Sequence, residues 1–188
     1  MSKEIIVNIF DTETTGLCVP MANDLDKQPH IAEIYVMKVI QKSNKSIEKI
    51  DELELLLKPP IELSKEITKI TGITNKMVEK EPTFRKKYLE IAEFFTGVDR
   101  MVAHNMTYDR NLLLFELARI DKQLNFPWPI QHVCTVEKSM KIEQRRMSLI
   151  NLHKELLGYE FETAHRARND VEALARVYEQ MLIKEMIL

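Results

Sequence analysis

Five residues in three short stretches have the types and spacing for metal-assisted hydrolysis. Asp11 and Glu13 lie in FDTETTGL, Asp109 lies in AHNMTYDRNLL, and His165 and Asp170 lie in AHRARNDVEAL. In two-metal hydrolysis of a phosphodiester, one divalent ion activates water and a second stabilises the departing oxygen. Four carboxylates and one imidazole can supply the ligands and the base for this chemistry. We therefore take all five as candidate catalytic residues and the four acids as candidate metal ligands.

The first two acids stand at the end of the most strand-like apolar run, residues 5–10. Residues two apart on an extended strand point the same way, so Asp11 and Glu13 would face one site. An acid-x-acid pair is a weak signal by itself, because the chain contains others, such as Glu52 and Glu54. Aspartate is disfavoured in strands and costly to bury without a partner. The position of the pair therefore favours a functional role over a solvated strand end.

The other three candidates lie at the starts of predicted helices. An acid such as Asp109 in a first turn also favours the helix dipole, so taken alone it is more readily structural. Asp170 comes one turn before Leu174 and borders the buried face of the last helix. An imidazole with a pKa near ~6.5 is suited to take a proton from water. The short spacing from His165 to Asp170 therefore favours a catalytic role for this histidine.

These residues border segments that predict strands and helices. Strands are predicted at residues 5–10, 30–40, 100–103, in a segment ending near Leu57, and near Val133. Helices are predicted from Ser64 to Gly72, from Thr83 to Gly97, at 109–120, from Ser148 to Gly158, and from Val171 to Leu182. Leu89, Ala92 and Phe95 would share the buried face of the second helix. This order predicts an α/β domain in which helices cover a mixed sheet.

Length and composition limit the class of protein. At 188 residues with 45% hydrophobic residues, a single domain spanning 1–188 is expected. The net charge of −2 argues against a strong non-specific DNA binder, but not against a nuclease whose metal ions supply local positive charge. Cys18 and Cys134 form no CxxC pair, which argues against a zinc site. The N-terminal stretch is neither a signal peptide nor a membrane span, so a cytoplasmic protein is expected.

The three motifs, in this order, resemble the DEDD exonucleases of the histidine subclass (DEDDh, DnaQ-like), which include the proofreading epsilon subunit of bacterial DNA polymerase III. FDTETTGL, HNMTYD and HRARND match the three family motifs, and ITGIT at 70–74 is similar to the segment between them. The similarity runs from about residue 4 to about residue 182. It implies a ribonuclease H-like fold, with a mixed five-stranded sheet and flanking helices.

The resemblance also implies roles for the candidate residues. Asp11 would bridge two divalent cations, Glu13 and Asp170 would help hold the water-activating ion, Asp109 would hold the leaving-group ion, and His165 would be the general base. All-oxygen ligands suit Mg²⁺ or Mn²⁺, so two such ions are the expected cofactors. Six further residues match positions near the 3′-terminal nucleotide: Thr14, Thr15, Leu17, His104, Asn105 and Tyr108.

The implied function is a 3′→5′ exonuclease that releases nucleoside 5′-monophosphates from the 3′ end of DNA, most readily from single-stranded or frayed ends. An exoribonuclease of the RNase T or oligoribonuclease kind shares the catalytic set and is the alternative. A non-catalytic nucleic-acid-binding or polymerase-accessory module would require a missing ligand, and all five residues are present. Compared with the family pattern, the loop from Cys18 to Pro29 is somewhat long. The chain ends at Leu188, so the resemblance does not extend to the tail by which epsilon docks to its polymerase.

Overall fold

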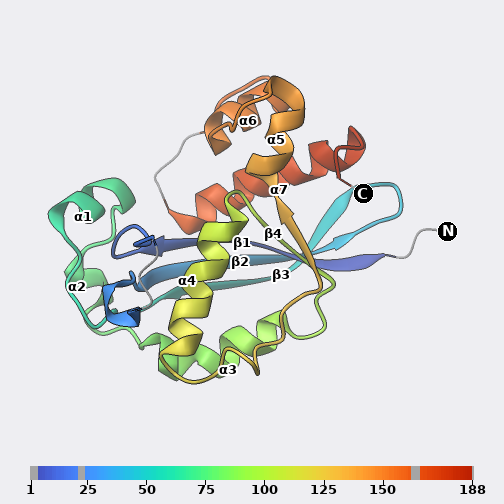
Figure 1. Ribbon diagram of the computed structural model, residues 1–188. Helices are drawn as coiled ribbons and strands as arrows, with labels where there is room; N and C mark the ends of the chain where they lie inside the picture. Colours follow the sequence, from blue (N-terminus) through green and yellow to red (C-terminus); the bar gives the residue numbers. More distant parts are fainter. Residues whose placement is uncertain (1–3, 21–23, 162–165, 188) are drawn as a thin grey trace.

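The computed structural model describes residues 4–20, 24–161 and 166–187, and its centre is one mixed sheet of five strands (Figure 1). The strand order is β3-β2-β1-β4-β5. The bounds are β1 Ile5–Thr14, β2 Ile31–Gln41, β3 Ile47–Leu56, β4 Arg100–Ala103 and β5 Gln131–Cys134. β1 pairs antiparallel with β2 and parallel with β4, so the predicted mixed five-stranded sheet is confirmed.

Helices pack on both faces of this sheet (Figure 1). In the described part of the chain they are η1 Leu25–Lys27, α1 Lys65–Thr71, α2 Asn75–Val78, α3 Phe84–Phe95, α4 Met106–Ala118, α5 Thr135–Glu143, α6 Leu149–Leu157 and α7 Ala167–Ile183. One core cluster joins α7 and α6 to one face of the sheet, and a second joins α3 and α4 to the other. No described helix is both long enough and apolar enough to cross a bilayer.

The central strand β1 is buried on both faces, which explains its nearly continuous apolar sequence. Val7 and Ile9 pack in the cluster with α7, whereas Phe10 packs in the cluster with α3 and α4. The strand continues beyond the predicted residues 5–10 as far as Thr14. Because side chains alternate along a strand, the face that carries Val7 and Ile9 also carries Asp11 and Glu13. The core packing of β1 therefore aims both acids toward α7.

Several predicted helix ends are confirmed by their capping geometry. The Ser64 and Ser148 hydroxyls each accept a hydrogen bond from the backbone N–H three residues later, at the starts of α1 and α6. Gly72 and Gly158 end these helices in the left-handed conformation, with φ of 71° and 87°. The predicted apolar face of the last helix is also buried: Val171, Leu174, Ala175, Tyr178, Met181 and Leu182.

Two further predicted helices are present, and Phe95 is buried as predicted, but other details of these helices were wrong. In α3, Leu89 is 76% exposed and the buried face carries Phe84, Ile91 and Phe95. These positions follow the helical period from the first residue of α3, and Leu89 falls on the opposite side. Thr83 precedes α3 but its side chain makes no capping hydrogen bond. The helix predicted at 109–120 instead spans Met106–Ala118, so it starts one turn earlier.

Candidate metal-binding active site

Three acids meet where the end of β1 approaches the first turn of α7. Asp11 and Glu13 come from the strand face that packs on α7, and Asp170 comes from the first turn of that helix. One carboxylate oxygen from each of the three lies within 4.8 Å of the others, and all three residues are half-buried. The structure therefore brings together acids from the first and third motifs, which lie at opposite ends of the sequence.

Asp109 reaches the same strand end from the opposite face of the sheet. It lies in the first turn of α4 and is only 3% exposed. Thr12, between the two acids of β1, points to this face, and its Oγ1 donates a hydrogen bond of 2.8 Å to Asp109 Oδ1. The charge on Asp109 also raises the pKa of Asp11 and of Glu13. A contribution to the helix dipole alone does not explain a side chain that is bound back to β1 in this way.

The pKa values of Asp11, Glu13 and Asp109 are raised above those of ordinary carboxyl groups. Burial raises the pKa of Asp11 well above its ordinary value, and the charges on Asp109, Glu13 and Asp170 raise it further. Burial, with the charge on Asp170 next in importance, raises the pKa of Glu13 to about 8. Burial raises the pKa of Asp109 to about 7, although hydrogen bonds from Thr12 oppose the shift. Crowded acids of this kind either bind protons or bind cations.

The donor set fits divalent cations. Among the described residues, the carboxylates of Asp11 and Glu13 have no hydrogen-bond or ion-pair partner, so their lone pairs are available. Carboxylate oxygens are the ligands that Mg²⁺ and Mn²⁺ prefer. Bound cations would offset the mutual repulsion that raises these pKa values. The acids could therefore hold metal ions at the end of β1.

The turn after Glu13 is fixed by hydrogen bonds around Gly16. Thr14 Oγ1 donates to the Gly16 carbonyl at 2.6 Å, and the Tyr108 hydroxyl from α4 donates to the same oxygen at 2.9 Å. Leu17 follows directly and is 83% exposed. An exposed leucine on a braced turn beside an acidic site is suited to contact a substrate. Thr14 and Tyr108 thus shape the turn, and Leu17 projects from it.

The remaining predicted substrate residues differ in what they contact. Thr15 pairs with His30: its backbone N–H donates to the His30 carbonyl, and its Oγ1 accepts from the His30 N–H. Asn105 precedes α4, is exposed, and makes no capping hydrogen bond through its side chain. It therefore presents its amide to solvent at the start of the helix that carries Asp109.

His104 uses both ring nitrogens inside the protein. Its Nε2 lies 3.1 Å from the Met147 carbonyl, which can only accept, so Nε2 carries the proton. Its Nδ1 then accepts from the Thr135 hydroxyl at 2.9 Å. Burial lowers the pKa of His104 to about 4, so the ring is neutral. These hydrogen bonds tie β4 to the start of α5 and to the segment before α6, and the role of His104 in a substrate pocket stays a prediction.

His165 lies outside the described residues, so its place relative to the acids stays a prediction. The described chain resumes at Arg166, the residue before α7. Asp170 Nα donates to the Arg166 carbonyl at 3.2 Å, which closes the first turn of the helix. In the sequence, His165 directly precedes Arg166, the N-cap residue of α7.

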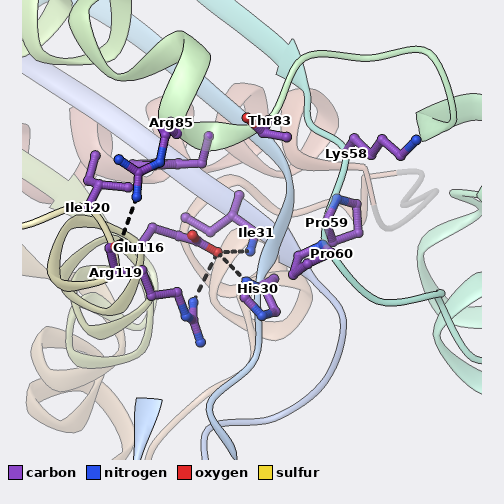
Figure 2. Close-up of a pocket in the computed structure, with 11 residues that line it drawn as sticks. His30, Ile31, Lys58, Pro59, Pro60, Thr83, Arg85, Glu116, Arg119 and Ile120 are labelled. Carbon is purple, nitrogen blue, oxygen red and sulfur yellow. Dashed lines mark hydrogen bonds and ion pairs between the residues drawn. The ribbon is translucent and has the colours of Figure 1, made fainter. Parts of the chain in front are cut away.

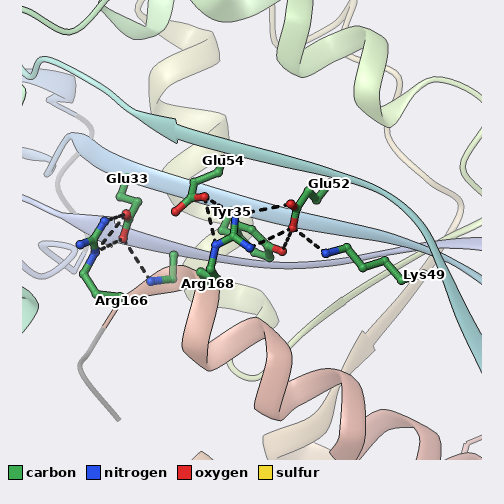
Figure 3. Close-up of polar contacts among 8 residues, drawn as sticks. Glu33, Tyr35, Lys49, Glu52, Glu54, Arg166 and Arg168 are labelled. Atoms are coloured by element: carbon green, nitrogen blue, oxygen red, sulfur yellow. Dashed lines mark hydrogen bonds and ion pairs between the residues drawn. The ribbon is translucent and has the colours of Figure 1, made fainter. Parts of the chain in front are cut away.

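Two buried acids near the site were not predicted. Glu33 on β2 is fully buried, pairs in register with Glu13, and forms an ion pair with Arg166 (Figure 3). Glu116 on α4 is 6% exposed and accepts from the His30 ring at 3.0 Å, beside a cavity of about 400 Å³ (Figure 2). Each is an acid within an otherwise apolar face, and this signal was available in the sequence.

The raised carboxyl pKa values predict how stability depends on pH. Unfolded carboxyl groups titrate near pH ~4, whereas folded Glu13 and Asp109 titrate at about 8 and about 7. Above about pH 6.5, His104 is neutral in the folded state and mostly neutral in the unfolded state, so the raised carboxyl pKa values decide the balance: the folded chain binds more protons than the unfolded chain, and its stability falls as pH rises. We expect the melting temperature of metal-free protein to decrease from about pH 6.5 to about pH 8. The decrease should be shallower in Asp11→Asn, and a melting temperature that rises over this range would contradict the electrostatic account.

The sequence is similar to a known exonuclease family and to individual curated proteins. The family model RNase_T, described as Exonuclease, matches residues 8–178. The chain is 28% identical over 169 residues to the PolC-type DNA polymerase III of Clostridium perfringens, and 32% identical over 180 residues to that of Caldanaerobacter subterraneus. These alignments cover 90% and 94% of this chain. The chain spans only 11% of the length of each of these relatives.

Solved structures share the fold at low sequence identity. The nuclease domain of 3′hExo, described as a DEDDh family member bound to rAMP, superposes with a TM-score of 0.76 at 17% identity, covering 97% of this chain and 94% of that one. A full-length 3′-exonuclease gives a TM-score of 0.76 at 18% identity, covering 100% and 85%. The expected ribonuclease H-like fold is thereby confirmed. Because the family model matches residues 8–178, which is most of the chain, the chain belongs to the RNase_T exonuclease family.

Proposed function

We propose that this domain is a metal-dependent 3′→5′ exonuclease that removes nucleoside 5′-monophosphates from the 3′ end of DNA. The observation that carries the proposal is the convergence of Asp11, Glu13 and Asp170 within 4.8 Å, with Asp109 bound to the same strand through Thr12. These acids would hold two divalent ions, Mg²⁺ or Mn²⁺. When bound, such ions polarise the scissile phosphate and neutralise the charge that develops on it.

The protein groups around the acids have separate tasks in this proposal. Leu17, exposed on its braced turn, would pack against the terminal nucleotide and hold its phosphate at the acids. Asn105, exposed at the start of α4, would offer its amide to the same nucleotide. His165 would remove a proton from the attacking water, which suits an imidazole at neutral pH. Thr14, Thr15 and Tyr108 would support the turn, as their hydrogen bonds do here.

DNA is the substrate we favour, because the sequence relatives are PolC-type DNA polymerases and the chain matches them over about nine-tenths of its length. A polymerase is for the same reason the protein partner we propose. The alternative substrate is RNA, since one solved structure of the same fold is described as bound to rAMP. We place the protein in the cytoplasm, where Cys18 and Cys134 would stay as the free thiols seen here.

Substitution of Asp11 tests the role of the acidic site. Asp11→Asn should abolish turnover in Mg²⁺ or Mn²⁺ while the protein stays folded, because the change removes a ligand and one of several repelling charges. The metal-free variant should melt at the same or a higher temperature than the wild type. Asp121→Asn, an exposed acid beyond α4, is the matched control and should keep full activity. Full turnover by the wild type in excess chelator would disprove the metal dependence.

The role of His165 predicts a specific pH profile. Under single-turnover conditions with saturating Mn²⁺, the wild-type rate should fall as pH drops below about 6.5, because a protonated imidazole cannot act as a base. His165→Ala should lose roughly 10²–10⁴-fold in rate at neutral pH and should no longer show this titration. A variant that keeps the wild-type profile would assign the base to another group.

Matched oligonucleotides test polarity and substrate. With Mg²⁺, single-stranded DNA carrying a 5′ label and a free 3′-OH should shorten one nucleotide at a time and release 5′-monophosphates. The same DNA with a 3′-phosphate block, or closed into a circle, should stay intact. RNA of the same sequence should be shortened more slowly. Faster digestion of RNA would favour the exoribonuclease alternative, and cleavage of the circle would contradict an exonuclease.

A further inference from the structure

A fifth carboxylate, Glu33, lies beside the acidic site and has an arrangement of its own. It stands on β2 directly opposite Glu13 in the antiparallel register and is fully buried. The register shifts just beyond this pair, so that Thr14 faces Ile31. Like charges directly opposite one another on adjacent strands repel, and a buried carboxylate is costly unless it is paired. A buried acid at this position therefore needs a cation.

Glu33 obtains that cation, and a helix amide, from the start of α7 (Figure 3). Arg166 Nε lies 3.1 Å from Oε1 and 3.0 Å from Oε2, and Arg166 Nη2 also donates to Oε1. The backbone N–H of Ala167 donates to Oε2 at 3.1 Å. Both oxygens of Glu33 are thus occupied by protein donors, whereas no residue in the described part of the chain donates a hydrogen bond to the carboxylates of Asp11 and Glu13. Glu33 is therefore suited to hold α7 and not to bind a metal ion.

Through this contact, Glu33 on the neighbouring strand β2 caps the start of α7. The first amides of a helix have no partner within the helix, and a carboxylate at this end matches the helix dipole. Arg166 occupies the N-cap position of α7 but its own side chain makes no capping hydrogen bond. Glu33 satisfies the Ala167 amide in its place. Asp170 follows within the same turn, because its N–H donates to the Arg166 carbonyl.

A second arginine provides a natural comparison. Arg168 lies over the ring of Tyr35, with 4.8 Å from Cζ to the ring centroid, and pairs with Glu54 and Glu52 on β3 (Figure 3). Its side chain is 36% exposed and that of Glu54 is 37% exposed, whereas that of Glu33 is 1% exposed. Exposed ion pairs contribute little to stability. The two arginines are similarly exposed, at 31% for Arg166 and 36% for Arg168, so the pairs differ in that the Glu33 carboxylate is buried.

We propose that Glu33 is a positioning residue, which fixes the first turn of α7 through Arg166 and Ala167 so that Asp170 meets Asp11 and Glu13. The inference rests on the proposed function, since it concerns how the acids of that site are brought together. It assigns a task to an acid outside the three motifs.

Mn²⁺ binding to metal-free protein, measured by calorimetry, tests this proposal without relying on activity. Glu33→Gln and Arg166→Gln should each weaken Mn²⁺ binding by roughly 10–100-fold, because both release α7. If these residues acted only through their charge, the two variants would have opposite effects. Glu33→Gln, which loses a negative charge, would weaken Mn²⁺ binding, and Arg166→Gln, which loses a positive charge, would strengthen it. The double variant should be no weaker than the worse single variant, as expected for two residues that act as one unit. In nuclease assays kcat should fall more than KM rises.

Controls separate positioning from folding. Glu54→Gln, which weakens the exposed pair with Arg168, should leave Mn²⁺ affinity within about twofold of the wild type. Arg166→Lys keeps the charge but loses the planar fork, so it should fold even if Glu33→Gln does not, and should still bind Mn²⁺ more weakly. Wild-type affinity in folded Glu33→Gln, or tighter binding in Arg166→Gln, would overturn the proposal while leaving the proposed function intact. A wild-type protein that binds no Mn²⁺ would overturn both.

Discussion

Mutual repulsion among buried carboxylates at the end of β1 is the constraint on which this structure depends. Two like charges about 4 Å apart cost about 1 kcal/mol in water and about 4 kcal/mol at an effective dielectric of 20. Burial raises the pKa values of Asp11, Glu13 and Asp109, and neighbouring negative charges raise those of Asp11 and Glu13 further. The fold must therefore hold these acids in place against their repulsion, and it does so with a strand packed on both faces and two helices that begin at the site.

The alternation of β1 distributes the site between the two faces of the sheet. Asp11 and Glu13 point to the α7 face, where Asp170 and the Glu33–Arg166 pair lie, and Thr12 between them points to α4 and binds Asp109. A three-residue segment of strand thus connects both helix starts. The same alternation packs Val7 and Ile9 against α7 and Phe10 against α3 and α4. The two-residue period of the strand therefore determines both which residues enter each core cluster and which direction the acids of the site face.

Features with local causes could be predicted from the sequence. The strand at β1, the caps at Ser64 and Ser148, and the common direction of Asp11 and Glu13 follow from propensity, capping and strand alternation. Features set by distant partners could not. Helix α5 buries Thr135, Val136 and Ser139, two of them polar, so hydrophobic periodicity gave no signal. His104 contacts Thr135 and Met147, and Glu33 pairs with Arg166 at the start of α7. No local sequence pattern reveals these partners.

Diffraction from crystals soaked in Mn²⁺ and a nucleoside 5′-monophosphate tests the central claim most directly, because anomalous scattering locates each ion. The account predicts two peaks at the end of β1, with Asp11 in contact with both, Glu13 and Asp170 beside one, and Asp109 beside the other. The nucleotide phosphate should lie between the ions. No peak among these acids under saturating Mn²⁺, or a single ion bound elsewhere on the chain, would contradict it.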